Sequence, residues 1–369
     1  MVTAWLSIAA LQALSSFLNG LLANNVALGV RNMLGFSVAG WIAGALAIAV
    51  GYTYHLATPH IVRATTIVGG FVLLLGGVAA IVLTTGAEAF GFPTPVSLVL
   101  PDTVSAGFNV YAQFYHTEET FDGHATRLWL FFPWAPLMGL GAVGITVISW
   151  LDRSLAWRLL GIAGGSVGTV FSWSRAAIIS LVIVVAARTL LLIPIFWRWV
   201  LVACFLTSLL VALLNGFEPL QSLADFETQV RDAREGSSSA RDLINEGSFE
   251  GFLQSPIFGH GWTALLPGLP VEMAMGGSSS FYGLLYTGGL TTFAAFVIAM
   301  VVTLIATISS VTRVPEGSEA HRYAVTGCLL MLTLILFCWS ESLFSTTLPC
   351  VFFFVFIGGV IAIDRKEEE

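Results

Sequence analysis

Residues 62–85, VRATTIVGGFVLLLGGVAAIVLTT, form the apolar stretch that decides the fold class. After Arg63 this segment has no charged side chain, and a helix of its length crosses a hydrocarbon core about 30 Å thick. The rest of the chain has the same character, because 56% of its 369 residues are hydrophobic and only 10% are charged. A water-soluble domain normally needs about 25% charged residues to cover its surface. We therefore expect an all-α, polytopic transmembrane helix bundle.

About ten apolar stretches are long enough, or nearly so, to span the bilayer as helices. They are expected near residues 4–28, 35–56, 62–85, 127–149, 155–172, 174–190, 191–214, 282–309, 321–342 and 345–363. The first apolar stretch is not preceded by basic residues, so we expect no cleaved signal peptide.

This pattern divides the chain into three parts. Residues 1–214 would hold the N-terminal membrane helices, with an outer loop at about 86–126. Residues 215–281 would form an extracytoplasmic loop with short helices, and residues 282–369 the C-terminal membrane helices and a cytoplasmic tail.

The positive charges predict the orientation, because short cytoplasmic loops collect basic residues. If both termini are cytoplasmic, nine basic residues lie inside and six lie outside. The inner ones are Arg63, Arg153, Arg158, Arg188, Arg198, Arg313, Arg322, Arg365 and Lys366. The outer ones are Arg31, Arg127, Arg175, Arg231, Arg234 and Arg241.

Composition and spacing exclude several other classes. The net charge of −7 argues against nucleic-acid binding, which needs a basic face. The four cysteines lie scattered within apolar stretches and indicate neither a disulfide framework nor a metal knuckle. Neither HxH nor HExxH spacing occurs, and no DxD-like acidic cluster stands near the outward arginines. We therefore expect no metal ion and no cofactor.

Arg175 is the most informative of the outward basic residues. In FSWSRAAIISLVIVV, residues 171–185, it stands at the outer start of an apolar helix, next to Ser174. An ionisable group at such depth is costly and usually has a task. The alternative is a guanidinium that reaches up to the lipid headgroups. Arg127, in GHATRLWLFF at 123–132, is placed in the same way at the start of the helix expected over 127–149, and for it both interpretations stay open.

The second outer loop contains Arg241 in a pattern that predicts a helix start. Behind a break at Gly236 and three serines, Ser239 and Asp242 have the spacing of a capping box, which would put Arg241 in the first turn of a short helix. First-turn N–H groups favour anions, and a planar guanidinium matches phosphate oxygens. Arg231 and Arg234 stand among acidic residues and are interpreted as a solvated, internally paired helix face.

Three motifs in a fixed order give the chain a family resemblance. They are SRAAIISL at 174–181, ARDLI followed by SPIFGHGW at 255–262, and GSSSFYGLLYTGGL at 277–290. Over roughly residues 120 to 345 the chain resembles the O-antigen ligase and O-antigen polymerase superfamily of bacterial membrane proteins, which are similar to C-type glycosyltransferases. The resemblance implies an enzyme that takes a glycan from an undecaprenyl-pyrophosphate carrier and attaches it to an acceptor sugar outside the inner membrane. It also implies that Arg175 and Arg241 hold the donor pyrophosphate, with Arg127 and His260 as further candidates for substrate binding.

The serines of the third motif depart from the family pattern. In the family the segment usually reads Gly-Ser-His-Ser, and the histidine is the candidate base for the acceptor hydroxyl; here Ser279 occupies that catalytic slot. Serine does not accept a proton near neutral pH as an imidazole does. Either turnover is impaired, or the acceptor loses its proton in another way, with His260 as a weak substitute. Ser279 would in any case serve as the N-cap of a helix that begins at Phe281.

These observations together predict a multi-pass protein of the bacterial inner membrane with cytoplasmic termini and an active site that faces outward. The preferred function is a glycosyltransferase that polymerises lipid-linked repeat units. The alternative acceptor is lipid A-core, which would make the protein an O-antigen ligase. A transporter or flippase for lipid-linked glycan is the rival from another class, although we find no internal repeat of the kind that transporters show.

Overall fold

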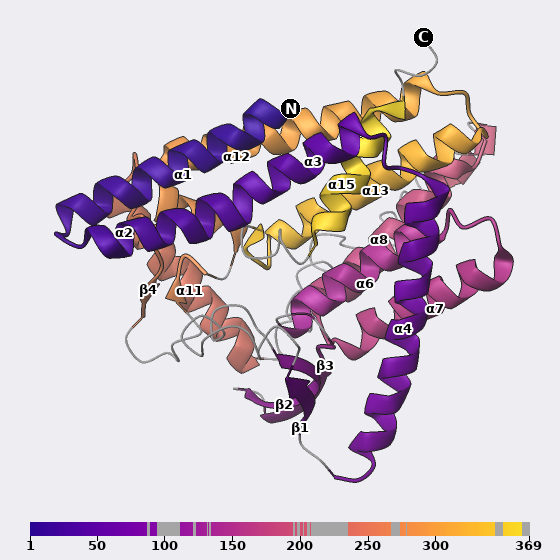
Figure 1. The fold of residues 1–369 in the computed structure, drawn as a ribbon, viewed down its shortest axis with the longest axis horizontal. Helices are drawn as coiled ribbons and strands as arrows, with labels where there is room; N and C mark the ends of the chain where they lie inside the picture. Colours follow the sequence, from indigo (N-terminus) through magenta and orange to yellow (C-terminus); the bar gives the residue numbers. More distant parts are fainter. Residues whose placement is uncertain are drawn as a thin grey trace.

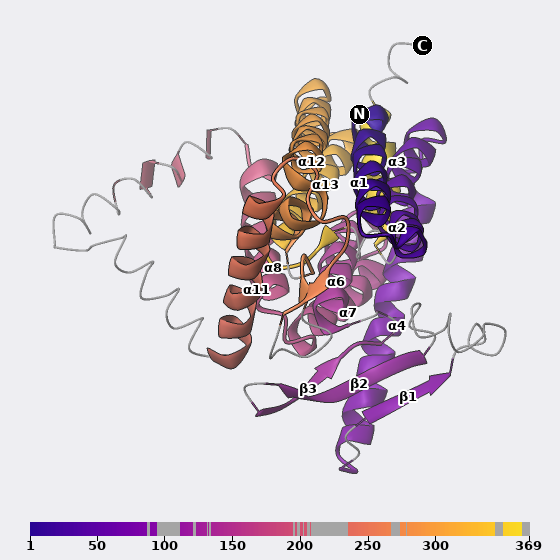
Figure 2. The same ribbon diagram turned by 90° about the vertical axis from the view of Figure 1, so that its left-hand side faces the viewer.

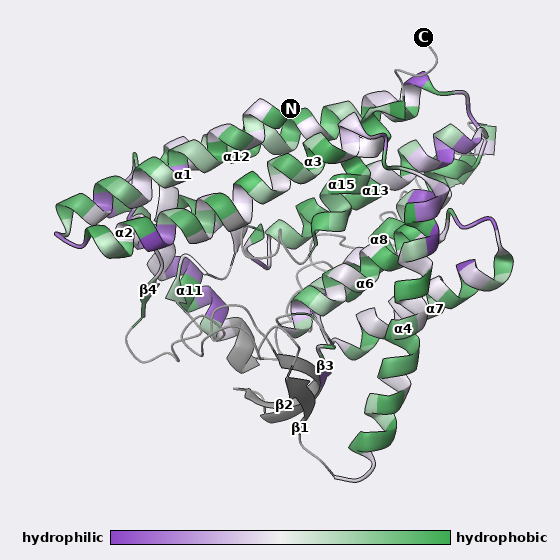
Figure 3. Cartoon of the chain, viewed as in Figure 1, coloured by the Kyte–Doolittle hydropathy of each residue, from purple (hydrophilic) through white to green (hydrophobic). Residues whose placement is uncertain are grey.

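The chain folds into a bundle of long apolar helices (Figures 1 and 3). Among the described residues, 6 helical segments are long and apolar enough to cross a membrane. The computed structural model describes residues 1–86, 89–93, 111–120, 123–130, 132, 134–194, 196–197, 200–201, 203–204, 207, 235–266, 274–277, 279–343 and 350–363. The prediction of an all-α polytopic bundle is confirmed.

The long helices agree closely with the predicted spans. They are α1 (Val2–Leu22), the run of α2 (Val26–Asn32), the π-helical η1 (Met33–Ile42) and α3 (Ala43–Thr53), then α4 (Pro59–Leu83), α8 (Arg175–Leu192), α12 (Ser280–Arg313) and α13 (Glu319–Cys338). Three shorter apolar helices are α6 (Ala135–Ser149), α7 (Leu155–Phe171) and α15 (Val351–Ile361). Most of the span expected at 191–214 lies outside the described residues.

Glycines allow two pairs of helices to pack closely. At Gly164 of α7 an added Cβ would lie only 1.7 Å from the carbonyl oxygen of Gly69 in α4. At Gly51 of α3 it would lie 1.9 Å from the carbonyl oxygen of Val355 in α15. Small residues are common at helix contacts in membranes, because lipid and protein interiors are equally apolar and close backbone packing must provide the attraction.

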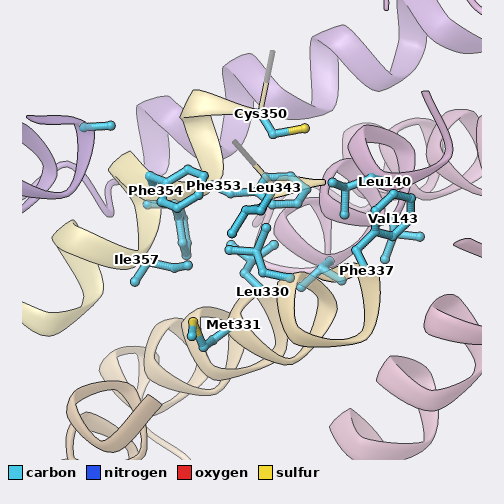
Figure 4. Close-up of a cluster of buried hydrophobic side chains, with 14 of the residues drawn as sticks. Leu140, Val143, Leu330, Met331, Phe337, Leu343, Cys350, Phe353, Phe354 and Ile357 are labelled. Atoms are coloured by element: carbon cyan, nitrogen blue, oxygen red, sulfur yellow. The ribbon is translucent and has the colours of Figure 1, made fainter. Parts of the chain in front are cut away.

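The buried core lies where α6, α13 and α15 meet (Figure 4). Phe353 and Phe354 of α15 are completely buried, as are Leu330 of α13 and Leu140 of α6. Gly144 makes room for this packing, since a Cβ there would overlap the ring of Phe353. This core fixes the position of the C-terminal end of α13, which leads into the site described below.

The outer loop expected at 86–126 contains a three-stranded antiparallel sheet, in the order β1 (Ala89–Pro93), β2 (Tyr111–Thr120) and β3 (Gly123–Leu128). Arg127 lies in β3, in register with His116, so its predicted position at a helix start is wrong. The helix expected over 127–149 begins only at Ala135. Its first turn takes Pro136, whereas a start at 127 would bury two prolines in the helix interior at a cost of about 3 kcal/mol each.

Helix α12 is broken at Gly289, whose φ of 66° is left-handed. The segment 256–261 satisfies the backbone groups that the break leaves unpaired. The amides of His260 and Gly261 donate to the carbonyls of Tyr286 and Thr287, and the amide of Leu290 donates to Pro256 O. Irregular backbone at membrane depth is tolerated only where protein surrounds it. The SPIFGHGW turn, in which Gly259 and Gly261 have positive φ, packs around the break.

Several basic residues lie together at one end of the bundle. Arg63 forms a bidentate ion pair with Asp152, Arg153 pairs with Glu319, and the Arg188 guanidinium lies 4.6 Å from the centre of the Trp150 ring. Glu319 is the first residue of α13, and Arg188 lies near the C-terminal end of α8. The start of α8 and the C-terminal end of α13 therefore both lie at the opposite end of the bundle. Figures 1 and 2 show the chain termini far from the sheet and from the lower end of α11 (Glu235–Gln254).

Candidate functional site

A cavity of about 1200 Å³ lies between α8, α11, α12 and the end of α13. Side chains from β3 and the first turn of α6 complete its wall. Its basic lining residues are Arg127, Arg175 and Arg241, which come from three elements that are far apart in the sequence. The structure thus brings together three of the five residues that the sequence nominated for a site.

Arg175 reaches the cavity because it is the first residue of α8. The hydroxyl of Ser174 accepts a hydrogen bond from the amide of Ala177 and caps the helix, as Ser and Thr commonly do. Trp173 before it has a φ of 52°, an uncommon conformation for a large residue that points to constraint at a functional site. The predicted position of Arg175 at a helix start is therefore correct.

Arg241 also lines the cavity, but its predicted position in a helix is wrong. Helix α11 runs without interruption from Glu235 through Gly236 and the serines, so Arg241 lies in the second turn rather than the first. Its guanidinium is oriented by two acceptors. Nη1 donates to Ser340 O at 2.8 Å, and Nη2 donates to Glu341 Oε1 at 2.9 Å. Arg241 therefore lacks the first-turn position that the sequence predicted, and its charge reaches the cavity through the guanidinium alone.

Glu341 is the site residue that sequence reasoning did not nominate. Its side chain is only 12% exposed and lines the cavity just beyond the end of α13. Burial raises the pKa of this carboxyl, while the Arg241 guanidinium opposes the rise. An acidic residue at the outer end of an otherwise apolar helix was the available signal, but the sequence does not reveal its pairing with Arg241.

Arg127 is 8% exposed, although it belongs to the sheet rather than to a membrane helix. Its positive charge acts on Glu341 in the same direction as that of Arg241, lowering the carboxyl pKa. Arg127 is thus a second positive charge that acts on Glu341. This buried position in the cavity lining does not favour the alternative in which Arg127 only contacts lipid headgroups.

Ser279 lies beside the cavity and is not among its lining residues. It is 2% exposed and is the N-cap of α12, with its Oγ accepting a hydrogen bond from the amide of Phe281 at 3.2 Å. The same hydroxyl donates to Cys338 O at 3.3 Å. The predicted capping role is confirmed, and the next two residues, Phe281 and Tyr282, do line the cavity.

His260 lies apart from the cavity lining, in the turn that supports the break in α12. Its Nε2 lies 2.8 Å from Gly251 O, and its ring stacks on Tyr286 with centroids 4.6 Å apart. These contacts give His260 a structural role between α11 and α12. Its proposed contact with substrate is not supported by a position in the cavity wall.

The described residues contain no group of three or more His, Cys, Asp or Glu side chains arranged to hold a metal ion. The charged side chains in the described part of the cavity lining are the guanidinium groups of Arg127, Arg175 and Arg241 and the carboxylates of Asp242, Glu246 and Glu341. Guanidinium groups bind phosphate oxygens through paired, charge-assisted hydrogen bonds. Such a set suits a diphosphate ligand.

Comparison with known protein families agrees with this geometry. Residues 160–278 match a family model described as O-antigen ligase. This chain resembles the O-antigen ligases. The matched segment contains Arg175, Arg241 and the SPIFGHGW turn, and it ends one residue before Ser279. No curated protein matches the chain significantly. This match supports the superfamily resemblance that the three motifs indicated.

Proposed function

We propose that the protein is a membrane glycosyltransferase that moves a glycan from an undecaprenyl-pyrophosphate donor to an acceptor sugar. The observation that carries this proposal is the convergence of Arg127, Arg175 and Arg241 on one cavity. Two of these residues fall within the segment that matches the O-antigen ligase family. A cavity of about 1200 Å³ also has room for a diphosphate and several sugar rings.

The reaction requires stabilisation of a leaving pyrophosphate. The acceptor oxygen forms a bond to the anomeric carbon of the donor, the bond from that carbon to the phosphate oxygen breaks, and its electron pair stays on the pyrophosphate. Fixed positive groups lower the barrier where negative charge develops. Arg175 at the start of α8 and Arg241 on α11 line the cavity from different helices. They would bind the two phosphates from different sides.

The preferred acceptor is a second lipid-linked glycan, which makes the protein a repeat-unit polymerase. An O-antigen ligase would use the same donor and transfer to lipid A-core instead, so the arginines fit both enzymes. Both activities belong at the outer face of the bacterial inner membrane. The cluster of Arg63, Arg153 and Arg188 supports a cytoplasmic position for the end opposite the cavity.

A transporter of lipid-linked glycan is favoured by one observation, the break in α12 at Gly289. Here, however, the turn at 256–261 packs into the break. Its backbone amides donate hydrogen bonds to the carbonyls of Tyr286 and Thr287, which the break leaves without helical partners. A transporter would leave its glycan chemically unchanged.

A reconstitution experiment distinguishes the three functions. Purified protein in liposomes is incubated with an undecaprenyl-pyrophosphate oligosaccharide, with and without lipid A-core, and the products are separated by mass. Longer lipid-linked glycans indicate a polymerase, and glycosylated lipid A-core indicates a ligase. Movement of an unchanged donor across the bilayer, with neither product, would contradict the transferase proposal.

A further inference from the structure

The proposed reaction needs a group that accepts the proton of the acceptor hydroxyl. Ser279 cannot take this role near neutral pH, because a serine hydroxyl is not a base there. His260 is held by Gly251 and Tyr286 outside the cavity lining. The site still contains a carboxylate for which the proposed function has so far given no role, Glu341.

Glu341 lies at the correct place for acid–base chemistry. Its backbone carbonyl accepts hydrogen bonds from the amide of Ser280 at 3.1 Å and from the hydroxyl of Ser280 at 2.8 Å. Ser280 is the neighbour of Ser279, so the backbone of Glu341 is joined to the segment that carries the slot of the expected base. Its carboxylate meanwhile lines the same cavity as the arginines.

We propose that Glu341 is the general base of the transfer reaction, in place of the histidine that this chain lacks at position 279. This inference rests on the proposed function. The acceptor hydroxyl gives its proton to the Glu341 carboxylate while its oxygen attacks the anomeric carbon. The leaving pyrophosphate keeps the electron pair of the broken carbon–oxygen bond, and Glu341 later releases the proton to water.

The surroundings of Glu341 tune it for this role. Burial raises its pKa above the ordinary range for a carboxyl, which brings it closer to the pH at which a general base works best. Arg241 and Arg127 oppose that rise, and the Trp134 side chain donates a hydrogen bond that has the same effect. Among the described residues, the other ionisable groups that face the cavity are Arg175, Asp242, Glu246 and Tyr282.

Arg241 connects the base to the donor site. Two of its N–H groups are used by Ser340 O and Glu341 Oε1. A guanidinium has five N–H donors in a fixed plane, so the same side chain has donors left for phosphate oxygens. The arrangement would place the base beside the bond that breaks, because one residue contacts both the base and the leaving group.

A purely structural role for Glu341 is the alternative, in which the carboxylate only orients Arg241. Glu341→Gln separates the two roles, because an amide oxygen still accepts a hydrogen bond from Arg241 but the side chain no longer takes a proton. Glu250→Gln is the matched control, since it removes an exposed carboxylate of α11 that is not among the cavity-lining residues. Donor binding and turnover are measured separately on each folded variant.

The base role predicts that Glu341→Gln lowers turnover at saturating donor by about 10²–10⁴-fold. Its affinity for undecaprenyl pyrophosphate should stay close to that of the wild type, and Glu250→Gln should change both quantities little. The wild-type rate should fall as the pH drops through the raised pKa of Glu341, since the protonated carboxyl accepts no proton. Adding Ser279→His to Glu341→Gln should recover part of the turnover, with the acidic limb moved toward the pKa of an imidazole, about 6.5.

Normal turnover of Glu341→Gln would overturn the base assignment and leave the proposed function intact. A loss of donor affinity without a loss of turnover at saturation would also overturn it, in favour of the orienting role. If the wild type itself transfers no glycan in the reconstituted assay, the proposed function fails first, and the base assignment fails with it.

Discussion

His260 and Tyr286 are joined twice, through their rings and through their backbones. The rings stack at 4.6 Å, and the amide of His260 donates to Tyr286 O at 2.8 Å. One residue belongs to the turn after α11 and the other to α12 just before its break. The contact therefore fixes α11, which carries Arg241, relative to the membrane helix that begins beside the cavity.

The break in α12 predicts that Gly289→Ala is strongly destabilising. A Cβ at this residue would lie 2.4 Å from Ile257 O, and the φ of 66° is itself strained for alanine. Backbone strain alone costs about 1–3 kcal/mol, and the overlap adds to it. Thermal unfolding in detergent should show a lower midpoint. Gly77→Ala in α4 is the control, because nothing lies within 4 Å of its added Cβ, and an unchanged midpoint for Gly289→Ala would contradict the described turn.

The cap at α12 predicts a mild effect for Ser279→Ala. Loss of the hydrogen bond to the amide of Phe281 should cost about 1 kcal/mol of stability. Glycosyl transfer should persist, since the serine hydroxyl is not the base. Abolished transfer in a folded Ser279→Ala protein would mean that this hydroxyl works directly on the substrate.

The pair of Arg63 and Asp152 predicts a dependence of stability on pH. Hydrogen bonding from Arg63 lowers the pKa of the buried Asp152 carboxyl below its ordinary value of ~3.9. A lowered pKa in the folded state gives stability that is complete above the ordinary pKa and is lost as the pH falls through the folded-state pKa. Asp152→Asn should therefore lower the unfolding midpoint near pH 7.

The difference between Asp152→Asn and the wild type should shrink below about pH 4, because the carboxyl then takes up its proton in the unfolded chain before it does so in the folded protein. Glu319→Gln is the control, because its ion pair with Arg153 is exposed and such pairs contribute little. A constant difference between pH 7 and pH 3 would show that the effect comes from packing rather than from charge.

The basic residues at the end opposite the cavity predict that this end is cytoplasmic and that the cavity faces outward. Glu250 lies on α11, which lines the cavity, and Glu316 lies in the turn between α12 and α13 at the opposite end; both are exposed. In intact cells an impermeant thiol reagent should label Glu250→Cys and should not label Glu316→Cys, both in a background without the four native cysteines. The reverse pattern would place the cavity in the cytoplasm.

The sequence predicted the membrane helices and Arg175 well, because each depends on local information. A long apolar run determines a span, and Ser174 before Arg175 is a local capping signal. Arg127 and Arg241 line the same cavity as Arg175, but the sequence predicted the wrong local structure for both. Arg127 belongs to a strand that forms a hairpin with the neighbouring segment 111–120, and strand preference depends more on such cross-strand packing than on local pattern.

The position of Arg241 shows a second limit. Gly236 and the three serines after it predicted an interruption of the helix, yet α11 continues through them. Local propensity is a weak guide where tertiary packing decides, and α11 packs so closely against α12 that a Cβ added at Gly251 would lie 2.4 Å from the Tyr286 ring. The pairing of Arg241 with Glu341, 100 residues later, has no local signal at all.

The binding of undecaprenyl pyrophosphate to purified protein tests the central claim most directly. Arg175→Ala and Arg241→Ala should each weaken binding about tenfold, as expected for the loss of charge-assisted hydrogen bonds. Lysine should substitute poorly where two parallel hydrogen bonds are made. Arg153→Ala, whose side chain is 70% exposed at the opposite end, should bind like the wild type. Unchanged affinity in both folded cavity variants would contradict the assignment of this cavity to the donor pyrophosphate.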